Sequence, residues 1–148
     1  MTKDEFYLNV AHALSGCQLV EQELKLYITE ALALANECIG GKMPFKMIGE
    51  DYEDSSLERL IQVFKKLSDN DDLVLKLNKF KDKRNYLSHK GISHCLDWDE
   101  ELFESAASQF QEQLEEIQKE SKKLREEIHW EGTKITVHLE FDDISEKD

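Results

Sequence analysis

Apolar residues recur every three or four positions through the first quarter of the chain. At 100° per residue this spacing places them along one side of a helix, and it predicts one helix from about residue 3 to residue 38. Thr2 and Glu5 have the spacing of a capping box at its start, and Gly40 and Gly41 follow its end. The predicted stripe contains Phe6, Val10, Ala13, Cys17, Val20, Leu24, Tyr27, Ile28, Ala31, Ala35 and Cys38.

This first helix has a second apolar face. Leu8, Leu19, Leu26 and Ala33 lie nearly opposite the main stripe. A helix with two apolar faces is either buried on both sides or covers a core on one side and a partner, such as a second copy, on the other. Both alternatives are consistent with the pattern.

Glu21 interrupts the edge of the main stripe. A carboxylate at this position costs stability unless a partner compensates its charge, and Arg84 is the candidate partner. Alternatively, Glu21 reaches solvent from the boundary of the buried face.

Two shorter helices are predicted in the middle of the chain. Residues 39–54 form a loop that is rich in apolar side chains and is expected to pack over the end of the bundle. A helix follows over residues 56–67, with a capping box formed by Ser55 and Glu58. The next helix starts near Asp71, and its apolar stripe is formed by Leu73, Leu77, Phe80, Arg84 and Leu87. Arg84 therefore lies on the core-facing side of its helix.

The last third of the chain changes its periodicity. A long helix is predicted from Asp97 to about Ile128, and residues 133–141 then alternate between apolar and polar, which is typical of a half-buried strand. The fold class expected is therefore all-α, an up-down four-helix bundle with a short C-terminal β-strand or hairpin. We assign residues 1–128 to the bundle domain and residues 129–148 to the β element and an acidic tail.

Composition supports a helical protein. The chain has 148 residues, enough for one domain, and its single proline and six glycines leave little material for turns.

No apolar run approaches the ~20 residues of a membrane span, and the start has no signal-peptide pattern, so a cytoplasmic location without membrane contact is expected. The widely spaced Cys17, Cys38 and Cys95 are expected to be reduced thiols.

The charge restricts the possible partners. A net charge of −13 argues against general binding to nucleic acid, whose phosphates are bound by cationic surfaces, whereas an acidic surface suits a basic partner protein. Activity on RNA would require a local basic patch. Residues 76–90 could supply one, because they hold six of the nineteen lysines and arginines and one acidic residue, Asp82.

This basic segment contains Arg84 and, five residues later, His89. A guanidinium can hold a phosphate through a fork of donors, and an imidazole can move a proton near neutral pH. Such a pair is what metal-independent cleavage of a phosphodiester needs. A solvated basic helix face with an unrelated histidine is the alternative. A zinc site formed by His89, His94 and Cys95 fits no common ligand spacing, so neither a metal nor a cofactor is expected.

The run Arg84-Asn85-Tyr86-Leu87-Ser88-His89 resembles the R-x(4–6)-H motif of HEPN domains, in which a polar residue follows the arginine. These domains are small helical bundles of toxin–antitoxin, abortive-infection and CRISPR systems, and many are endoribonucleases. The resemblance implies a homodimer with a composite site. It also implies RNA as substrate and an antitoxin or another partner protein.

The resemblance gives each residue a role. Arg84 would hold the scissile phosphate, His89 would take the proton of the ribose 2′-hydroxyl, and Asn85 would orient either group. The neighbouring lysines would bind the RNA backbone, namely Lys79, Lys81, Lys83 and Lys90. Tyr86, inside the motif, is expected to serve packing.

The geometry of a straight helix complicates this interpretation, because it places His89 about 140° from Arg84. Either the helix ends before Gly91 and His89 swings round, or two protomers share the site, as the resemblance favours. Some HEPN toxins carry a tyrosine two residues after the motif histidine, and its modification regulates them. Gly91 occupies that position, so this regulation is not expected here. A non-catalytic HEPN-like interaction or scaffold module, and an unrelated helical dimer, are the alternative functions.

Overall fold

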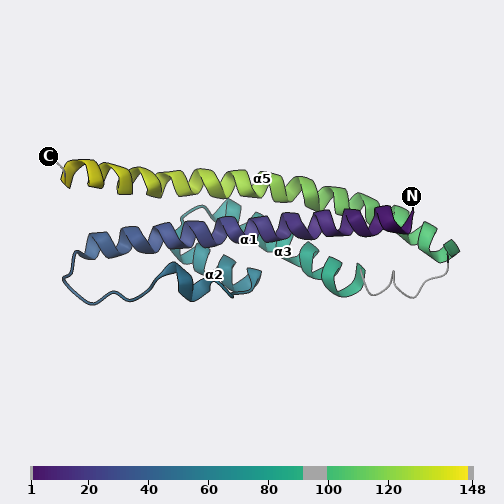
Figure 1. The fold of residues 1–148 in the computed structure, drawn as a ribbon, viewed down its shortest axis with the longest axis horizontal. Coiled ribbons are helices and arrows are strands. Elements are labelled where there is room, and N and C mark those ends of the chain that lie inside the picture. Colours follow the sequence, from purple (N-terminus) through teal and green to yellow (C-terminus); the bar gives the residue numbers. More distant parts are fainter. Residues whose placement is uncertain (1, 92–99, 147–148) are drawn as a thin grey trace.

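The computed structural model describes the chain at residues 2–91 and 100–146. Within these ranges the secondary structure is helical throughout, with four α-helices, a 3₁₀ turn at Gly49–Tyr52 and a π turn at Leu87–Gly91. Figure 1 shows two long helices, α1 and α5, lying side by side, with the shorter α2 and α3 packed against them. The α-helices are α1 (Lys3–Ile39), α2 (Leu57–Leu67), α3 (Asp71–Tyr86) and α5 (Glu100–Glu146).

The bounds of α1 confirm the sequence prediction. The Thr2 hydroxyl accepts the Glu5 N–H at 3.2 Å, and the Thr2 N–H donates to the Glu5 carboxylate at 3.0 Å, which completes the capping box. At the other end Gly40 adopts a left-handed conformation with φ 58°, which costs glycine little because it has no Cβ.

The start of α2 is shifted by one residue from the prediction. Ser56, and not Ser55, accepts the Arg59 N–H at 3.3 Å and caps the helix. In the preceding loop Tyr52 is buried as expected, whereas Met43 and Met47 are about half exposed. The loop therefore covers the core through Tyr52 and the partly buried Phe45.

A buried acid fixes the start of α3 against α5. The side chain of Asn70 caps α3 by accepting the Leu73 N–H at 3.1 Å, and it donates to the Glu131 carboxylate at 2.9 Å. The same carboxylate pairs with Lys134 at 3.0 Å. Glu131 is buried but compensated, and it links the two helices that form the walls of the candidate site.

The predicted strand at residues 133–141 is wrong, because α5 continues through this segment to Glu146. Ile135 lies four residues before the partly buried Leu139 and seven after the buried Ile128, so the segment also has helical spacing. A lone strand would leave the backbone N–H and C=O groups along both of its edges unpaired. A helix pairs these groups within itself, and here it also extends the contact with α1. Burial against α1 thus overrides the β propensity of the segment.

A pair of substitutions distinguishes the helix from the strand. Ile135 is 9% exposed and Val137 is 46% exposed, although a strand would place both on one face. We expect Ile135→Ala to lower the free energy of unfolding by about 2–4 kcal/mol, and Val137→Ala to change it by less than about 0.5 kcal/mol. Denaturant unfolding measures both, and similar losses would contradict the helix.

The helix directions differ from those of an up-down bundle. Asn9 bonds to Gln111, Gly16 lies against Ser121, and Glu30 accepts from Thr136, so α1 and α5 run parallel. An up-down bundle would make its first and fourth helices antiparallel, and this part of the prediction is wrong. The parallel pair approaches closely at Gly16, where an added Cβ would lie 2.5 Å from the Ser121 hydroxyl.

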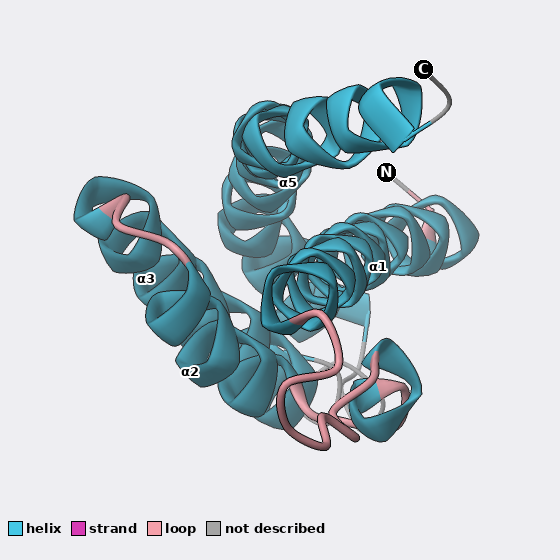
Figure 2. Ribbon diagram, turned by 90° about the vertical axis from the view of Figure 1, so that its left-hand side faces the viewer, coloured by secondary structure: helices cyan, strands magenta, loops and turns pink. Residues whose placement is uncertain are grey.

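The core is one cluster between α1 and the other helices, and Figure 2 shows α5 on one side of α1 and α2 and α3 on another. Its largest fully buried side chains include Phe6, Phe64 and Phe80. The second apolar face of α1 stays outside this cluster, since Leu8, Leu19 and Leu26 are each about half exposed. Among the residues that the structure describes, no helix combines the length and apolar character needed to span a membrane.

Candidate functional site

Arg84 lies in the last turn of α3, facing α1. Its Nη2 is 3.8 Å from Oε1 of Glu21, and its Nη1 donates to the Asn85 side chain at 3.4 Å. Of the two alternatives for Glu21, the structure shows the pairing with Arg84, at a distance that is long for an ion pair. The Nε atom is buried and has no hydrogen-bond partner, while 36% of the side chain is exposed. Most donors of this guanidinium are consequently unfilled among the described contacts.

His89 follows within the π turn. The α-helix ends at Tyr86, but the helical path continues as a π turn through Gly91, and Leu87 anchors this turn in the core. A π turn holds more residues per turn than an α-helix, so His89 is rotated from Arg84 by less than the 140° of a straight helix. The His89 side chain is exposed. A site shared by two protomers stays a prediction.

The predicted RNA-binding lysines are partly compensated by α5. Lys83 lies 2.8 Å from Glu116 and 2.6 Å from Glu120. These hydrogen bonds raise the pKa of Lys83, and the bond from Lys83 lowers the pKa of Glu116. Lys76 forms a similar pair with Glu127 at 2.9 Å. The basic segment therefore presents less positive charge than its sequence implies.

The other predicted lysines differ among themselves. Lys79 is exposed and lines a cleft between α3 and α5 together with Lys123, which sequence analysis did not identify. The Lys81 side chain is largely buried and lies 3.9 Å from Asp82. The side chain of Lys90 lies outside the described part. Lys79 is thus exposed, but the carboxylates of Glu120 and Glu127 line the same cleft and offset its charge.

Cys17 lies on α1, one turn before Glu21. Burial raises the pKa of its thiol to about 11, an effect that the Arg84 charge opposes and the Glu21 charge reinforces. Because the folded pKa exceeds the unfolded value, the protonated thiol stabilises the fold below about pH 9, and this contribution is lost as the pH rises toward about 11. The thiol is a core group and not a nucleophile at neutral pH.

The thiol chemistry can be measured directly. At pH 8 we expect iodoacetamide to modify the exposed Cys38 and to leave Cys17 unmodified in the native protein. Only about one in a thousand Cys17 thiols is ionised at that pH, and burial blocks access. Mass spectrometry of the peptides measures the fraction of each cysteine that is modified, with denatured protein as the control. Equal modification in the native state would contradict the buried position.

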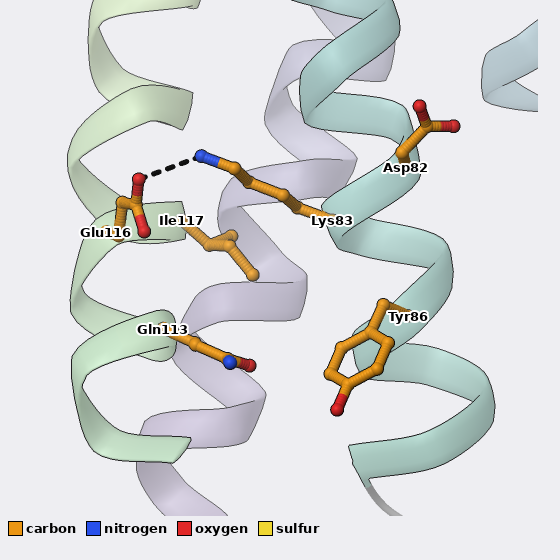
Figure 3. A pocket seen from close by; sticks show the side chains of 6 residues that line it. All are labelled: Asp82, Lys83, Tyr86, Gln113, Glu116 and Ile117. Carbon is orange, nitrogen blue, oxygen red and sulfur yellow. Dashed lines mark hydrogen bonds and ion pairs between the residues drawn. The ribbon is translucent and has the colours of Figure 1, made fainter. Parts of the chain in front are cut away.

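Sequence analysis missed a cleft beside the motif. Tyr86, expected to serve packing only, is 46% exposed, and its ring stacks on Phe110 of α5 with centroids 6.4 Å apart. The cleft has a volume of about 420 Å³ between α3 and α5. It is lined by Asp82, Lys83, Tyr86, Gln113, Glu116 and Ile117 (Figure 3). Its two walls are some thirty residues apart in the chain, so no local motif could reveal it.

Neither the search for metal ligands nor the comparison with known proteins assigns a function to the site. Within residues 2–91 and 100–146, no three His, Cys, Asp or Glu side chains are grouped as metal ligands would be. His94 and Cys95, two of the three residues of the unfavoured zinc site, lie outside the described residues, as does Asp97. No family model, curated protein or solved structure matches the chain.

Proposed function

We propose that this protein is a HEPN-like, metal-independent endoribonuclease of a toxin–antitoxin or phage-defence system. One observation carries the proposal: a partly exposed arginine with unfilled donors is followed, within one π turn, by an exposed histidine. Both residues belong to the R-x(4–6)-H run. π turns within helical segments are frequent at functional sites, which adds support.

The proposed reaction uses groups of both protomers of a dimer. Arg84 neutralises the scissile phosphate, and His89 removes the proton from the 2′-hydroxyl. The 2′ oxygen attacks the phosphorus, the bond to the 5′ oxygen breaks, and this oxygen leaves with a proton from the second His89 of the dimer. The products are a 2′,3′-cyclic phosphate and a 5′-hydroxyl. Asn85, which already contacts Arg84, orients the guanidinium.

The test is RNA cleavage by the purified protein in EDTA, with analysis of the new ends. The proposal expects cleavage of single-stranded RNA and 2′,3′-cyclic phosphate ends. Absence of cleavage over a varied set of RNAs would reject it. Ends with a 3′-hydroxyl would also reject it, since they require a different nucleophile.

The position of Glu21 restricts how a composite site can form. Glu21 and the outward Leu19 are two residues apart on α1 and point about 160° from each other. A dimer through the outer leucines would therefore place the two Arg84 side chains on remote surfaces. We propose that the catalytic dimer instead forms at the end of α3. In sedimentation, Leu19→Glu is then expected to leave the dimer intact, and its dissociation would refute this interface.

The second candidate is a non-catalytic HEPN-like module that binds or organises another protein. It is favoured by the compensation of Lys83 and by the Arg84–Glu21 contact, both of which reduce the charge available to RNA. The half-exposed outer face of α1 would then be the contact surface. This candidate expects neither cleavage nor RNA binding near physiological salt, in contrast to the first.

A further inference from the structure

The cleft between α3 and α5 combines an aromatic wall with a polar one. Figure 3 shows the Tyr86 ring and the Gln113 amide extending from opposite helices into the space between them, with α1 behind. The Lys83–Glu116 pair crosses one end, and Asp82 points away from the gap. The deep surface includes the buried Ile117. The cleft therefore combines apolar surface from Tyr86 and Ile117 with hydrogen-bonding groups from Gln113, Lys83 and Glu116.

The exposed ring is the feature that packing does not explain. Tyr86 contacts Phe110 on one side but keeps nearly half of its surface in solvent, two residues after Arg84. A buried core aromatic would be covered on all sides. A ring that is supported from one side and open on the other is the arrangement on which single-stranded nucleic acids stack their bases.

We propose that this cleft is a nucleobase subsite, in which a base of single-stranded RNA stacks on Tyr86 and meets the Gln113 amide with its polar edge. The choice of RNA rests on the proposed function. A volume of about 420 Å³ falls within the range of small-ligand pockets, roughly 300–1,000 Å³. An amide supplies a donor and an acceptor, which suits the edge of a base. The charge of Lys83 is compensated by Glu116 and Glu120, so stacking and the amide carry the recognition, not charge.

The subsite receives a nucleotide next to the one that is cleaved. Arg84 faces α1, whereas Tyr86 and Lys83 face α5, so the two groups lie on different sides of α3. One nucleotide cannot fill both positions in one protomer. A strand that crosses the end of α3 can place its phosphate at Arg84 and a neighbouring base in the cleft.

The experiment measures binding, separately from cleavage, with a short 2′-O-methyl RNA oligonucleotide. This probe lacks the nucleophilic hydroxyl, and a matched oligonucleotide with abasic positions has the same charge. By fluorescence anisotropy, Tyr86→Ala is expected to weaken binding of the base-bearing probe roughly 5- to 150-fold, while Tyr86→Trp stays near wild type. For the abasic probe, Tyr86→Ala and wild type are expected to bind equally.

Two further variants separate the base from the backbone. Leu75→Ala, at an exposed position of the same helix, is the matched control and is expected to bind both probes like wild type. Arg84→Ala is expected to weaken the binding of both probes by the same factor, because the proposal places the Arg84 side chain against a phosphate, which both probes have. Circular dichroism tests whether each variant is folded. If Tyr86→Ala unfolds, Gln113→Ala replaces it, since it removes the amide proposed to meet the base and is expected to weaken only the base-bearing probe.

The outcomes distinguish this subsite from the nuclease. Cleavage by wild type combined with unchanged binding by Tyr86→Ala would overturn the subsite and leave the nuclease standing. Tyr86-dependent binding without any cleavage would support the subsite and reject the nuclease. A wild-type protein that binds neither probe would overturn the subsite, and the cleavage assay would then decide the nuclease separately.

Discussion

Arg84→Ala and His89→Ala are each expected to reduce the proposed RNA cleavage by about a hundredfold or more. Removal of a general base or of a donor that stabilises developing charge typically has an effect of this size. Arg84→Lys is expected to restore only part of the rate, because an ammonium keeps the charge but loses the planar fork. Cleavage is measured in EDTA with equal amounts of folded protein.

For Arg84→Ala, the loss expected in cleavage does not reflect unfolding. The Arg84–Glu21 pair is long and partly exposed, and such pairs contribute about 1 kcal/mol or less. Glu21→Gln is the matched control, because it removes the carboxylate that competes with phosphate for Arg84 and leaves the arginine in place. If the proposed cleavage occurs, this variant is expected to cleave at least as fast as wild type. Unchanged cleavage by both alanine variants would assign the activity to another site or to a contaminant.

Phe80→Ala lowers the free energy of unfolding by about 3–5 kcal/mol. Phe80 is fully buried one turn before Arg84, so its removal leaves a cavity under the end of α3. Proteins of this size are stable by only about 5–15 kcal/mol, so the variant should lose a large part of its stability. Denaturant unfolding measures the change, provided that the dependence of the free energy of unfolding on denaturant concentration is the same in both proteins.

The control for this prediction lies on the same helix. Leu75 is about half exposed, and Leu75→Ala should change the free energy of unfolding by less than about 0.5 kcal/mol. Similar losses for the two variants would contradict the packing of α3 described above. Since Phe80 supports the turn that carries the motif, Phe80→Ala should also reduce cleavage at temperatures where it remains folded.

Local sequence patterns determined the helices and their caps. The spacing of Phe6, Val10 and their successors predicted α1 within one residue, because helical periodicity and capping depend on neighbours in the chain. The same reasoning placed Arg84 on the inner side of α3 and identified Glu21 as its candidate partner. The sequence also supplied the Arg84–His89 spacing and the resemblance on which the proposed function depends.

The features that depend on residues far apart in the chain were decided by the tertiary structure. Residues 133–141 became helix because contact with α1 outweighs their alternation, and no local pattern reveals that contact. The carboxylates that compensate Lys83 come from Glu116 and Glu120, and their effect on the basic segment depends on the packing of α5 against α3. The same packing leaves the Tyr86 ring open beside Gln113. Periodicity therefore determined the elements, whereas the charge and shape of the candidate site were decided by how the helices pack.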